Sequence, residues 1–189
     1  MSKIILEITM SLDGFVAGPS ISAEHPLGKG GERLHDWLFS AKTEVDEAVL
    51  ATIHKNMGAV VVGGNTYVTA IDDAWGGKTP FEIPAFVATN KPINEQKDGF
   101  TYVTDGLEET IKRAVKAANG KDVWVMGGGG TIAACIEGGW YDEFYLHVAP
   151  VLLKNGLKLF DHLNDRQVDF KNLGVSQSPQ ATHMVLGKI

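Results

Sequence analysis

The sequence has little cysteine, little positive charge and no long hydrophobic run, and each shortage excludes a class of protein. Its single cysteine, Cys135, can form no internal disulfide and lacks the spaced partners of a zinc site. The 17 Lys and Arg are outnumbered by 23 Asp and Glu, and the net charge of −6 argues against nucleic acid as a partner. No apolar run could span a membrane, and Glu7 and Asp13 interrupt the region where a signal peptide would be apolar. We therefore expect a cytoplasmic protein that binds neither nucleic acid nor membrane.

Several common catalytic motifs are missing as well. The chain has no phosphate-binding loop of the G-x-x-x-x-G-K-[ST] type and no G-x-S-x-G nucleophile turn. Its glycine tract departs from G-x-G-x-x-G because Ile132 occupies the final position. The histidines show no metal-ligand spacing, so we expect no metal site and regard each histidine as a surface or locally satisfied residue. They are His25, His35, His54, His147, His162 and His183.

The chain alternates apolar strands with amphipathic helices, and it shows no repeat and no linker. Its 189 residues can form one domain with a sizeable core, so we expect a single domain over residues 1–189. Strands are expected at 3–10, 59–62, 85–88, 100–103, 123–126 and 141–149, with two late strands near 169–174 and 183–188. Helices are expected at 33–42, from Thr43 onward with Asp46 at the third position of its cap, at 107–118 and at 132–136. This order predicts an α/β fold with a mostly parallel central sheet flanked by helices and a C-terminal antiparallel hairpin.

The stretch 123–131 combines a buried strand, four glycines and the start of a helix. Glycines let the backbone turn sharply, and the free N–H groups of a helix N-terminus attract anions. One interpretation is a cradle for the pyrophosphate of a dinucleotide. The other is a tight turn that merely needs positive φ angles. From these residues alone both interpretations stay open.

Small, polar or glycine-rich residues follow five of the expected strands, at 11–18, 63–67, 89–91, 104–106 and 127–131. The carboxyl ends of parallel strands meet at one edge of a sheet, where ligands of open α/β sheets bind. We therefore expect one extended ligand to lie across this edge.

The order of motifs resembles the dihydrofolate reductase superfamily, and more closely the reductase domain of bifunctional riboflavin-biosynthesis enzymes. The segments that carry the resemblance are 10–17, 63–67, 125–129 and 150–153 leading to Leu159-Phe160, which together span nearly the whole chain. The resemblance implies a reductase that uses NADPH to transfer a hydride to a C=N or C=O bond of a small heterocyclic substrate, pterin-like or riboflavin-precursor-like. It also implies a homodimer formed through the late strands.

The resemblance assigns a cofactor role to each glycine turn. The residues implied are Gly127, Gly128, Gly129, Gly130 and Thr131 at the pyrophosphate, Asn65 and Thr66 at phosphates, Val16 and Ala17 at the nicotinamide, and Thr89, Asn90 and Lys91 at the adenosine end. The family usually has Arg where this chain has Gly64, and that Arg grips the phosphate that distinguishes NADPH from NADH. Lys91 can replace it as a point charge, which keeps NADPH as the expected cofactor and NADH as the alternative.

The substrate side of the site departs further from the family pattern. Asp36 is the nearest candidate for a catalytic carboxylate, yet helical geometry places it about 200° from Leu34, away from the core. An alignment that turns His35 and Phe39 toward the ligand is the alternative. The apolar wall for the substrate is expected from Trp37, Phe39 and the loop 11–17, which carries Asp13. Cations for a substrate phosphate are expected from Lys154, with Lys158, Lys29 or Arg33 as further candidates. The rival hypothesis is a dinucleotide-binding sensor or scaffold without turnover.

Overall fold

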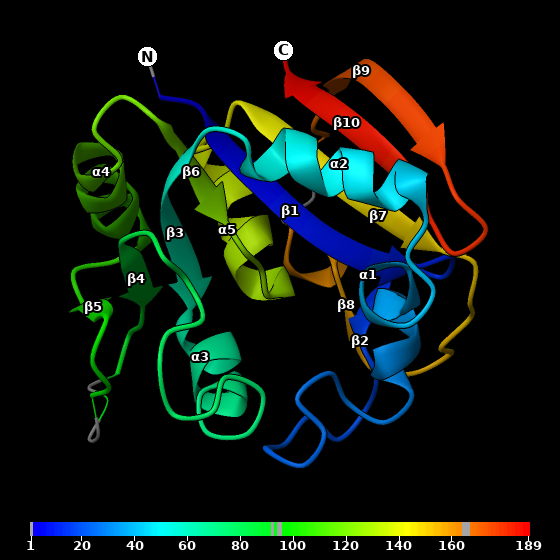
Figure 1. The fold of residues 1–189 in the computed structure, drawn as a ribbon, viewed down its shortest axis with the longest axis horizontal. Coiled ribbons are helices and arrows are strands. Elements are labelled where there is room, and N and C mark those ends of the chain that lie inside the picture. The colour runs from blue at the N-terminus through cyan, green and yellow to red at the C-terminus, as the bar shows by residue number, and fades with distance from the viewer. Residues whose placement is uncertain (1, 92, 94–95, 164–166) are drawn as a thin grey trace.

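A computed structural model describes residues 2–91, 93, 96–163 and 167–189. Its main sheet has eight strands in the order β5-β4-β3-β6-β1-β7-β10-β9 (Figure 1). These strands are β1 (Ile4–Ser11), β3 (Met57–Gly63), β4 (Ala85–Ala88), β5 (Phe100–Val103), β6 (Asp122–Val125), β7 (Glu143–Ala149), β9 (Phe170–Gln177) and β10 (Thr182–Lys188). A second, two-stranded sheet pairs β2 (Phe15–Ala17) with β8 (Leu157–Lys158).

The first six strands in this order, from β5 to β7, are parallel to one another. β10 then pairs antiparallel with β7 and with β9. The expected α/β class, with a mostly parallel sheet and a C-terminal antiparallel hairpin, is confirmed. β2 and β8 were not predicted, because strands of three and two residues are too short to show a periodic pattern.

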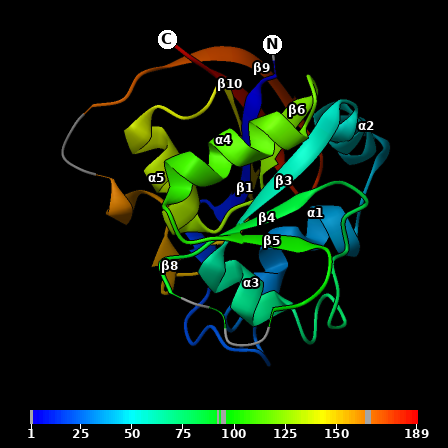
Figure 2. The ribbon, with the colours of Figure 1, turned by 90° about the vertical axis from the view of Figure 1, so that its left-hand side faces the viewer.

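Helices cover both faces of the sheet (Figures 1 and 2). Helices α4 (Leu107–Ala117) and α5 (Gly129–Gly138) pack on one face, and their apolar side chains join Leu6 of β1 in the largest core cluster. Helix α2 (Glu44–His54) packs on the other face, where its Ile53 meets Ile5 and Tyr145. The 3₁₀-helix η1 (Gly31–His35) and the short helix α1 (Asp36–Phe39) continue this second layer. Helix α3 (Gly64–Ala70) follows β3 directly.

The central strand β1 separates two chemically different layers. Leu6, Ile8 and Met10 point into the apolar cluster under α4 and α5. Glu7 and Thr9 alternate with them and therefore face the layer that contains α1 and α2. Among the described residues, no helix is both long and apolar enough to cross a membrane.

The segment 31–42 differs from the single helix expected at 33–42. It forms η1 and α1 instead, and the predicted apolar stripe of Leu34, Leu38 and Ala41 is wrong, because only Leu34 of the three is buried. The large aromatic Trp37 takes the inward position at 1% exposure, whereas Phe39 is 78% exposed. Burying an indole stabilises the fold more than burying the small Ala41 side chain, and two short turns bring Trp37 inward.

The predicted cap of α2 is confirmed. The backbone N–H and the hydroxyl of Thr43 both donate to Asp46 Oδ2, each at 2.7 Å. Asp46 is fully buried, which a cap on an exposed helix end does not require. Its second carboxylate oxygen is engaged elsewhere, as described below.

We predict that Leu6→Ala lowers the free energy of unfolding by about 2 to 5 kcal/mol, because it opens a cavity in the core. The Leu6 side chain is fully buried on the central strand. Leu12→Ala is the matched control, since Leu12 is 62% exposed, and we expect it to stay within about 0.5 kcal/mol of the unmodified protein. Urea unfolding followed by tryptophan fluorescence measures both. Equal losses for the two variants would contradict the position of β1 in the core.

Candidate functional site

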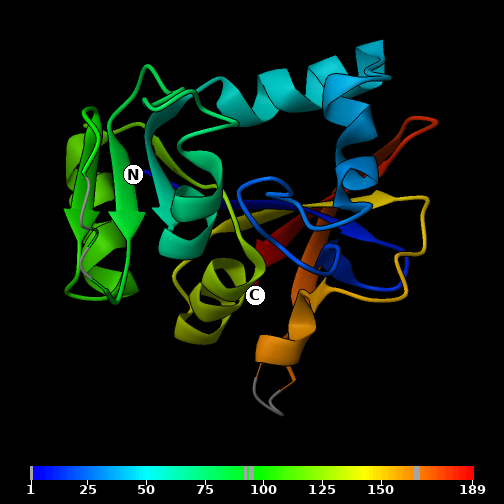
Figure 3. The same cartoon turned by 90° about the horizontal axis from the view of Figure 1, so that it is seen from below.

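Two glycine turns predicted from the sequence lie packed together at the carboxyl edge of the sheet. Gly128 N donates to Thr66 Oγ1 at 3.0 Å, which joins the turn after β6 to helix α3 after β3. Gly63 N also donates to Gly127 O at 3.4 Å. A Cβ atom at Gly63 would collide with the hydroxyl of Thr131. Close approach therefore requires glycine at position 63, and α3 and α5 lie side by side at this edge (Figure 3).

A third predicted turn adjoins these two. A Cβ atom at Gly64 would lie 3.1 Å from the Thr89 side chain, so the end of β4 packs against the start of α3. The Thr89 hydroxyl donates to Lys91 O at 2.7 Å and accepts from Lys91 N at 3.2 Å, which fixes the turn. Asn90 and Lys91 are exposed beyond it. The structure thus brings together the residues predicted for the phosphates and for the adenosine end.

The four glycines of the tract have different surroundings. Gly127 has a φ of 57°, the left-handed value that the turn interpretation requires. A Cβ atom at Gly128 would lie 3.0 Å from Thr66 Oγ1, and one at Gly129 would lie 2.9 Å from Val16 Cγ2. Around Gly130, apart from its chain neighbours and the backbone of its own helix, no described atom lies within 4 Å of the Cβ position, and its φ lies outside the left-handed region. Internal packing and backbone conformation therefore account for the first three glycines but not for Gly130.

The predicted nicotinamide residues lie next to this tract. Val16 and Ala17 are in β2 at 7% and 6% exposure, and the Val16 side chain packs against Gly129. The apolar surface of β2 is thus adjacent to the start of α5.

Asp13 joins the loop after β1 to the loop after β7. Its carboxylate accepts hydrogen bonds from Leu153 N at 3.1 Å, from Lys154 N at 2.8 Å and from Ser11 Oγ at 2.5 Å. The Ser11 hydroxyl, more than the backbone donors, holds the pKa of Asp13 below its usual value. Asp13 thus positions Lys154, whose side chain is exposed.

The residues predicted for catalysis and for the apolar wall do not form one surface. Asp36 lies 3.3 Å from Arg33 Nε and accepts from Ser40 Oγ at 2.8 Å. Trp37 is buried, and its Nε1 donates to Thr9 Oγ1 at 3.2 Å. Phe39 points to solvent. The acid and substrate roles of these side chains stay predictions.

A buried chain of four polar side chains lies beneath Trp37, and sequence reasoning missed it. Asp46 Oδ1 is 2.9 Å from His183 Nε2, and His183 Nδ1 is 2.9 Å from His147 Nδ1. His147 Nε2 lies 3.4 Å from Glu7 Oε1. Trp37 packs on both rings, with centroid distances of 4.5 and 5.0 Å. The available signal was that His147 alternates with the inward residues Phe144, Leu146 and Val148, which places it on the opposite, α2-covered face.

His35 of η1 contributes to the same buried region. Its Nδ1 is buried and has no hydrogen-bond partner among the described residues, and the same holds for Glu7 Oε2 and for His147 Nε2. Burial lowers the pKa of His35 to about 4, and the charge of His147 lowers it further, whereas Glu7 acts in the opposite direction. Burial also lowers the pKa of His183, against the raising effect of Asp46. Both effects favour neutral rings at neutral pH.

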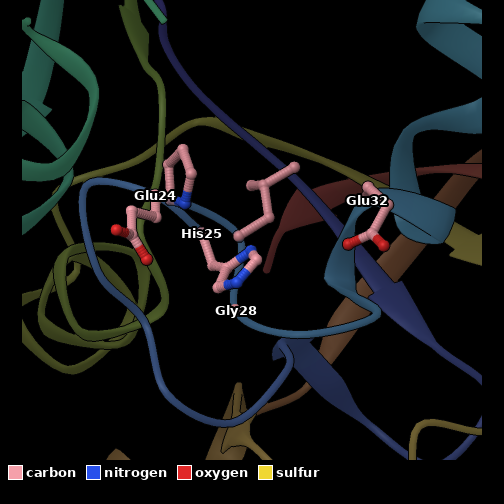
Figure 4. Close-up of a pocket in the computed structure, with 6 residues that line it drawn as sticks. Glu24, His25, Gly28 and Glu32 are labelled. Carbon is pink, nitrogen blue, oxygen red and sulfur yellow. The ribbon is translucent and has the colours of Figure 1, made fainter. Parts of the chain in front are cut away.

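Two pockets lie away from these residues. One, of about 330 Å³, is formed by Glu24, His25, Pro26, Leu27, Gly28 and Glu32 in the loop before η1 (Figure 4). The other, of about 340 Å³, is lined by His54, Met57, Pro80, Phe81, Glu82, Ile83 and Trp124. Within the described part of the chain, no group of three His, Cys, Asp or Glu side chains could hold a metal ion.

The model of the RibD C-terminal domain family matches residues 2–184. The chain belongs to that family. Its curated relatives include the uncharacterized protein YwjB of Bacillus subtilis strain 168, which is 26% identical over 186 residues, 96% of this chain and 95% of YwjB.

Three solved structures share the fold of this chain. A Shewanella sp. PV-4 protein assigned to riboflavin biosynthesis has a TM-score of 0.73 at 21% identity, with 99% of both chains covered. The Thermotoga maritima diaminohydroxyphosphoribosylaminopyrimidine deaminase/5-amino-6-(5-phosphoribosylamino)uracil reductase has a TM-score of 0.67 at 14% identity, covering 100% of this chain and 57% of that one. Enterococcus faecalis dihydrofolate reductase, complexed with NADP(H) and RAB-propyl, has a TM-score of 0.61 at 11% identity, covering 98% of this chain and 95% of that one. These likenesses show the fold.

The buried His35 ring makes the stability of this RibD C-terminal domain depend on pH. The pKa of His35 is about 4 in the folded chain against 6.5 for an ordinary histidine, so below pH 6.5 the unfolded chain binds a proton that the folded chain does not. Stability therefore falls as the pH decreases through this window. From about pH 7.5 to about pH 5 we expect His35→Asn to lose about 2 kcal/mol less unfolding free energy than the unmodified protein. Urea unfolding at both pH values measures this, with His25→Asn in the exposed loop as control; identical losses for His35→Asn and the unmodified protein would contradict the burial.

Proposed function

We propose that this protein is an NADPH-dependent reductase that transfers a hydride to a C=N or C=O bond of a small heterocyclic substrate, pterin-like or riboflavin-precursor-like. Membership of the RibD C-terminal domain family supports an oxidoreductase. The Thermotoga neighbour carries a uracil reductase in its name, and the Enterococcus neighbour is complexed with NADP(H). We take residues 1–189 as one domain for this function.

The open space beside Gly130 is the observation that carries the proposal. Gly130 lies in the first turn of α5, exposed, at the edge where three strand-end turns meet. Neither a positive φ nor a neighbouring atom explains why this position lacks a side chain. A bound pyrophosphate explains it, because its oxygens approach the backbone N–H groups at a helix N-terminus.

The residues present fit such a cofactor. The pyrophosphate would be held by Gly127 to Thr131, with Asn65 and Thr66 at the neighbouring helix start, and the adenosine end would lie by Thr89, Asn90 and Lys91. Val16 and Ala17 would offer an apolar surface to the nicotinamide. When bound, the reduced nicotinamide supplies the hydride; the protein binds, orients and excludes water.

The substrate side of the proposal uses the loops around β2 and η1. Lys154, held in place through its backbone by Asp13, would offer an exposed ammonium group to an anionic substituent. Phe39 is exposed and available for stacking, whereas Trp37 would act from below by supporting this layer. The role of Asp36 as the acid remains a prediction from the sequence, and a different carboxyl group is proposed for that role below.

A second candidate function is a dinucleotide-binding sensor or scaffold without turnover. The observation that favours it is that Arg33 and Ser40, which flank helix α1, both bind the Asp36 carboxylate. A binder and an enzyme share the same cradle and differ only in whether NADPH is oxidised.

The proposal also includes a homodimer. β9 is one of the two edge strands of the main sheet, and it exposes Leu173 at 48% and Val175 at 58%. An exposed apolar edge strand favours pairing with a second copy.

The experiment that tests the function is a titration of the purified protein with NADPH and with NADH, followed by nicotinamide fluorescence. We expect saturable NADPH binding and weaker NADH binding. Gly130→Asp should weaken NADPH binding at least tenfold, roughly 1.4 kcal/mol or more, because its carboxylate would face the pyrophosphate. The fold should persist, since the position is open and an acidic residue suits the first turn of a helix.

Gly130→Ala is the matched size control, and we expect it to weaken NADPH binding less than Gly130→Asp does, because its methyl group obstructs the close approach of the pyrophosphate without adding a charge. Absence of binding to either nucleotide would reduce the glycine tract to a turn and overturn the proposal. NADPH oxidation with a panel of pterins, riboflavin precursors and quinones then separates the two functions. Binding without oxidation of NADPH by any of them would favour the sensor or scaffold.

Lys91 determines the preference for NADPH in this proposal. We predict that Lys91→Ala weakens NADPH binding by about fivefold and leaves NADH binding unchanged, because an exposed cation contributes at most about 1 kcal/mol to a phosphate contact. The same fluorescence titration, repeated at high salt, measures the effect. Lys116→Ala on the outer surface of α4 is the charge control. Equal losses for both nucleotides would show that Lys91 does not distinguish them.

A further inference from the structure

The chain Asp46–His183–His147–Glu7 connects three strands and a helix through the buried layer under Trp37. Asp46 begins it in α2, His183 and His147 are direct cross-strand partners in β10 and β7, and Glu7 ends it in β1. The side chains of Asp46, His183 and His147 are 0%, 1% and 0% exposed, whereas that of Glu7 is 11% exposed. Glu7 is therefore the least buried end of this chain.

The hydrogen-bond pattern fixes the protons at the Asp46 end. Asp46 Oδ2 accepts two hydrogen bonds from Thr43, so the carboxylate is an acceptor, and its Oδ1 requires a proton on His183 Nε2. With His183 neutral, its Nδ1 is then an acceptor. The 2.9 Å contact between the two Nδ1 atoms requires that His147 carry its proton on Nδ1.

This assignment of protons leaves the contact between His147 and Glu7 one proton short. A neutral His147 with its proton on Nδ1 presents a bare Nε2 to Glu7 Oε1, and an ionised Glu7 would place two acceptors opposite each other at 3.4 Å. Buried polar groups require partners, so this contact needs one additional proton, shared between the ring and the carboxyl group. Glu7 Oε2 and His35 Nδ1, both buried and unpartnered among the described residues, lie at the same end.

The position of Glu7 connects this proton to the proposed cofactor edge. Glu7 precedes Ile8, and a Cβ atom at Gly127 would lie 3.6 Å from Ile8 Cδ1 and 4.0 Å from the Glu7 carbonyl oxygen. The backbone of Glu7 thus lies near the glycine tract, while its side chain points to the layer of η1 and α1, where the substrate residues are proposed. The Asp36 carboxylate is bound by Arg33, whereas Glu7 retains an oxygen with no hydrogen-bond partner among the described residues.

We propose that Glu7 is the acid of the site and that His147, His183 and Asp46 are positioning residues that hold one proton on the Glu7–His147 pair. The assignment rests on the reductase function proposed above. The substrate carbon accepts the hydride and the C=N π bond breaks toward nitrogen. The nitrogen lone pair then takes the proton from Glu7, which leaves a carboxylate beside a neutral His147. Solvent returns one proton through Glu7 after turnover.

The titratable groups around Glu7 come from every packed element. They are His147 and Tyr145 from β7, His183 from β10 and His35 from η1, with Asp46 from α2 reached through His183. Tyr145 Oη already donates to Glu143 Oε2 at 3.4 Å, so it is directed away from the pair.

The first test needs neither cofactor nor substrate. In protein labelled with ¹⁵N at histidine and ¹³C at glutamate, NMR shows whether each ring nitrogen carries a proton and whether Glu7 is ionised. At neutral pH we expect His183 to be protonated on Nε2 and His147 on Nδ1, with His147 Nε2 between the protonated and bare states. In Glu7→Gln, His147 Nε2 should become bare. A bare His147 Nε2 opposite an ionised Glu7 in the unmodified protein would overturn the proposal.

The second test compares two carboxylates in single-turnover hydride transfer with a substrate from the panel. We expect Glu7→Gln to slow the chemical step at least a hundredfold at unchanged NADPH affinity, and Asp36→Asn to change it less than about threefold. The reverse order would overturn the assignment of Glu7. Asp46→Asn should shift the midpoint of the pH–rate profile rather than lower the rate uniformly; a uniform loss would overturn the positioning role. If the unmodified protein oxidised no NADPH, the reductase proposal would fail, and the NMR result would still decide where the proton lies.

Discussion

The hydrogen bond from Gly128 N to Thr66 Oγ1 is the contact on which the arrangement of the carboxyl edge depends. It joins the turns after β6 and β3, two strands that are neighbours in the sheet but distant in the sequence. Close approach is possible because Gly63 leaves room for Thr131, and Gly64 leaves room for Thr89. Three turns then form one continuous surface, and the first turn of α5 remains open at Gly130. Packing thus produces the cradle, and the cradle limits what can bind there to a group that approaches the backbone closely.

Strand β1 connects this edge with the interior, because its two faces pack against different layers. Its apolar face, with Leu6 and Ile8, is part of the core under α4 and α5 and touches the glycine tract. Its other face carries Glu7 and Thr9 into a layer that is both buried and polar. Trp37 closes that layer by packing on His147 and His183 and bonding Thr9. A strand fixed by apolar packing therefore holds a carboxyl group within one residue of the proposed cofactor edge.

Much of the fold and of the cofactor side could be predicted from the sequence, because local patterns carry that information. Apolar runs ending in glycine or threonine identify strand ends, and parallel pairing necessarily brings those ends to one edge. The prediction of one helix at 33–42 was wrong because the helix boundaries depend on the burial of Trp37. Tertiary packing decides that burial, and the local sequence does not show it. Asp46 shows the same limit, since its role as a cap was local and predictable, whereas its bond to His183 joins residues 137 positions apart.

The histidines show why polar clusters are harder to predict than apolar ones. Spacing along the chain identifies metal ligands on a single element, but His147 and His183 meet through antiparallel pairing of β7 with β10. Burying polar groups lowers the stability of the fold unless each group has a hydrogen-bond partner. Removing one member of a buried set destabilises the fold by more than the intact set stabilises it. An all-apolar layer under Trp37 would stabilise the fold without needing any hydrogen-bond partners. The layer instead retains four polar side chains, and the oxygen without a hydrogen-bond partner among the described residues belongs to Glu7. This arrangement is expected if Glu7 exchanges a proton with a substrate or with solvent.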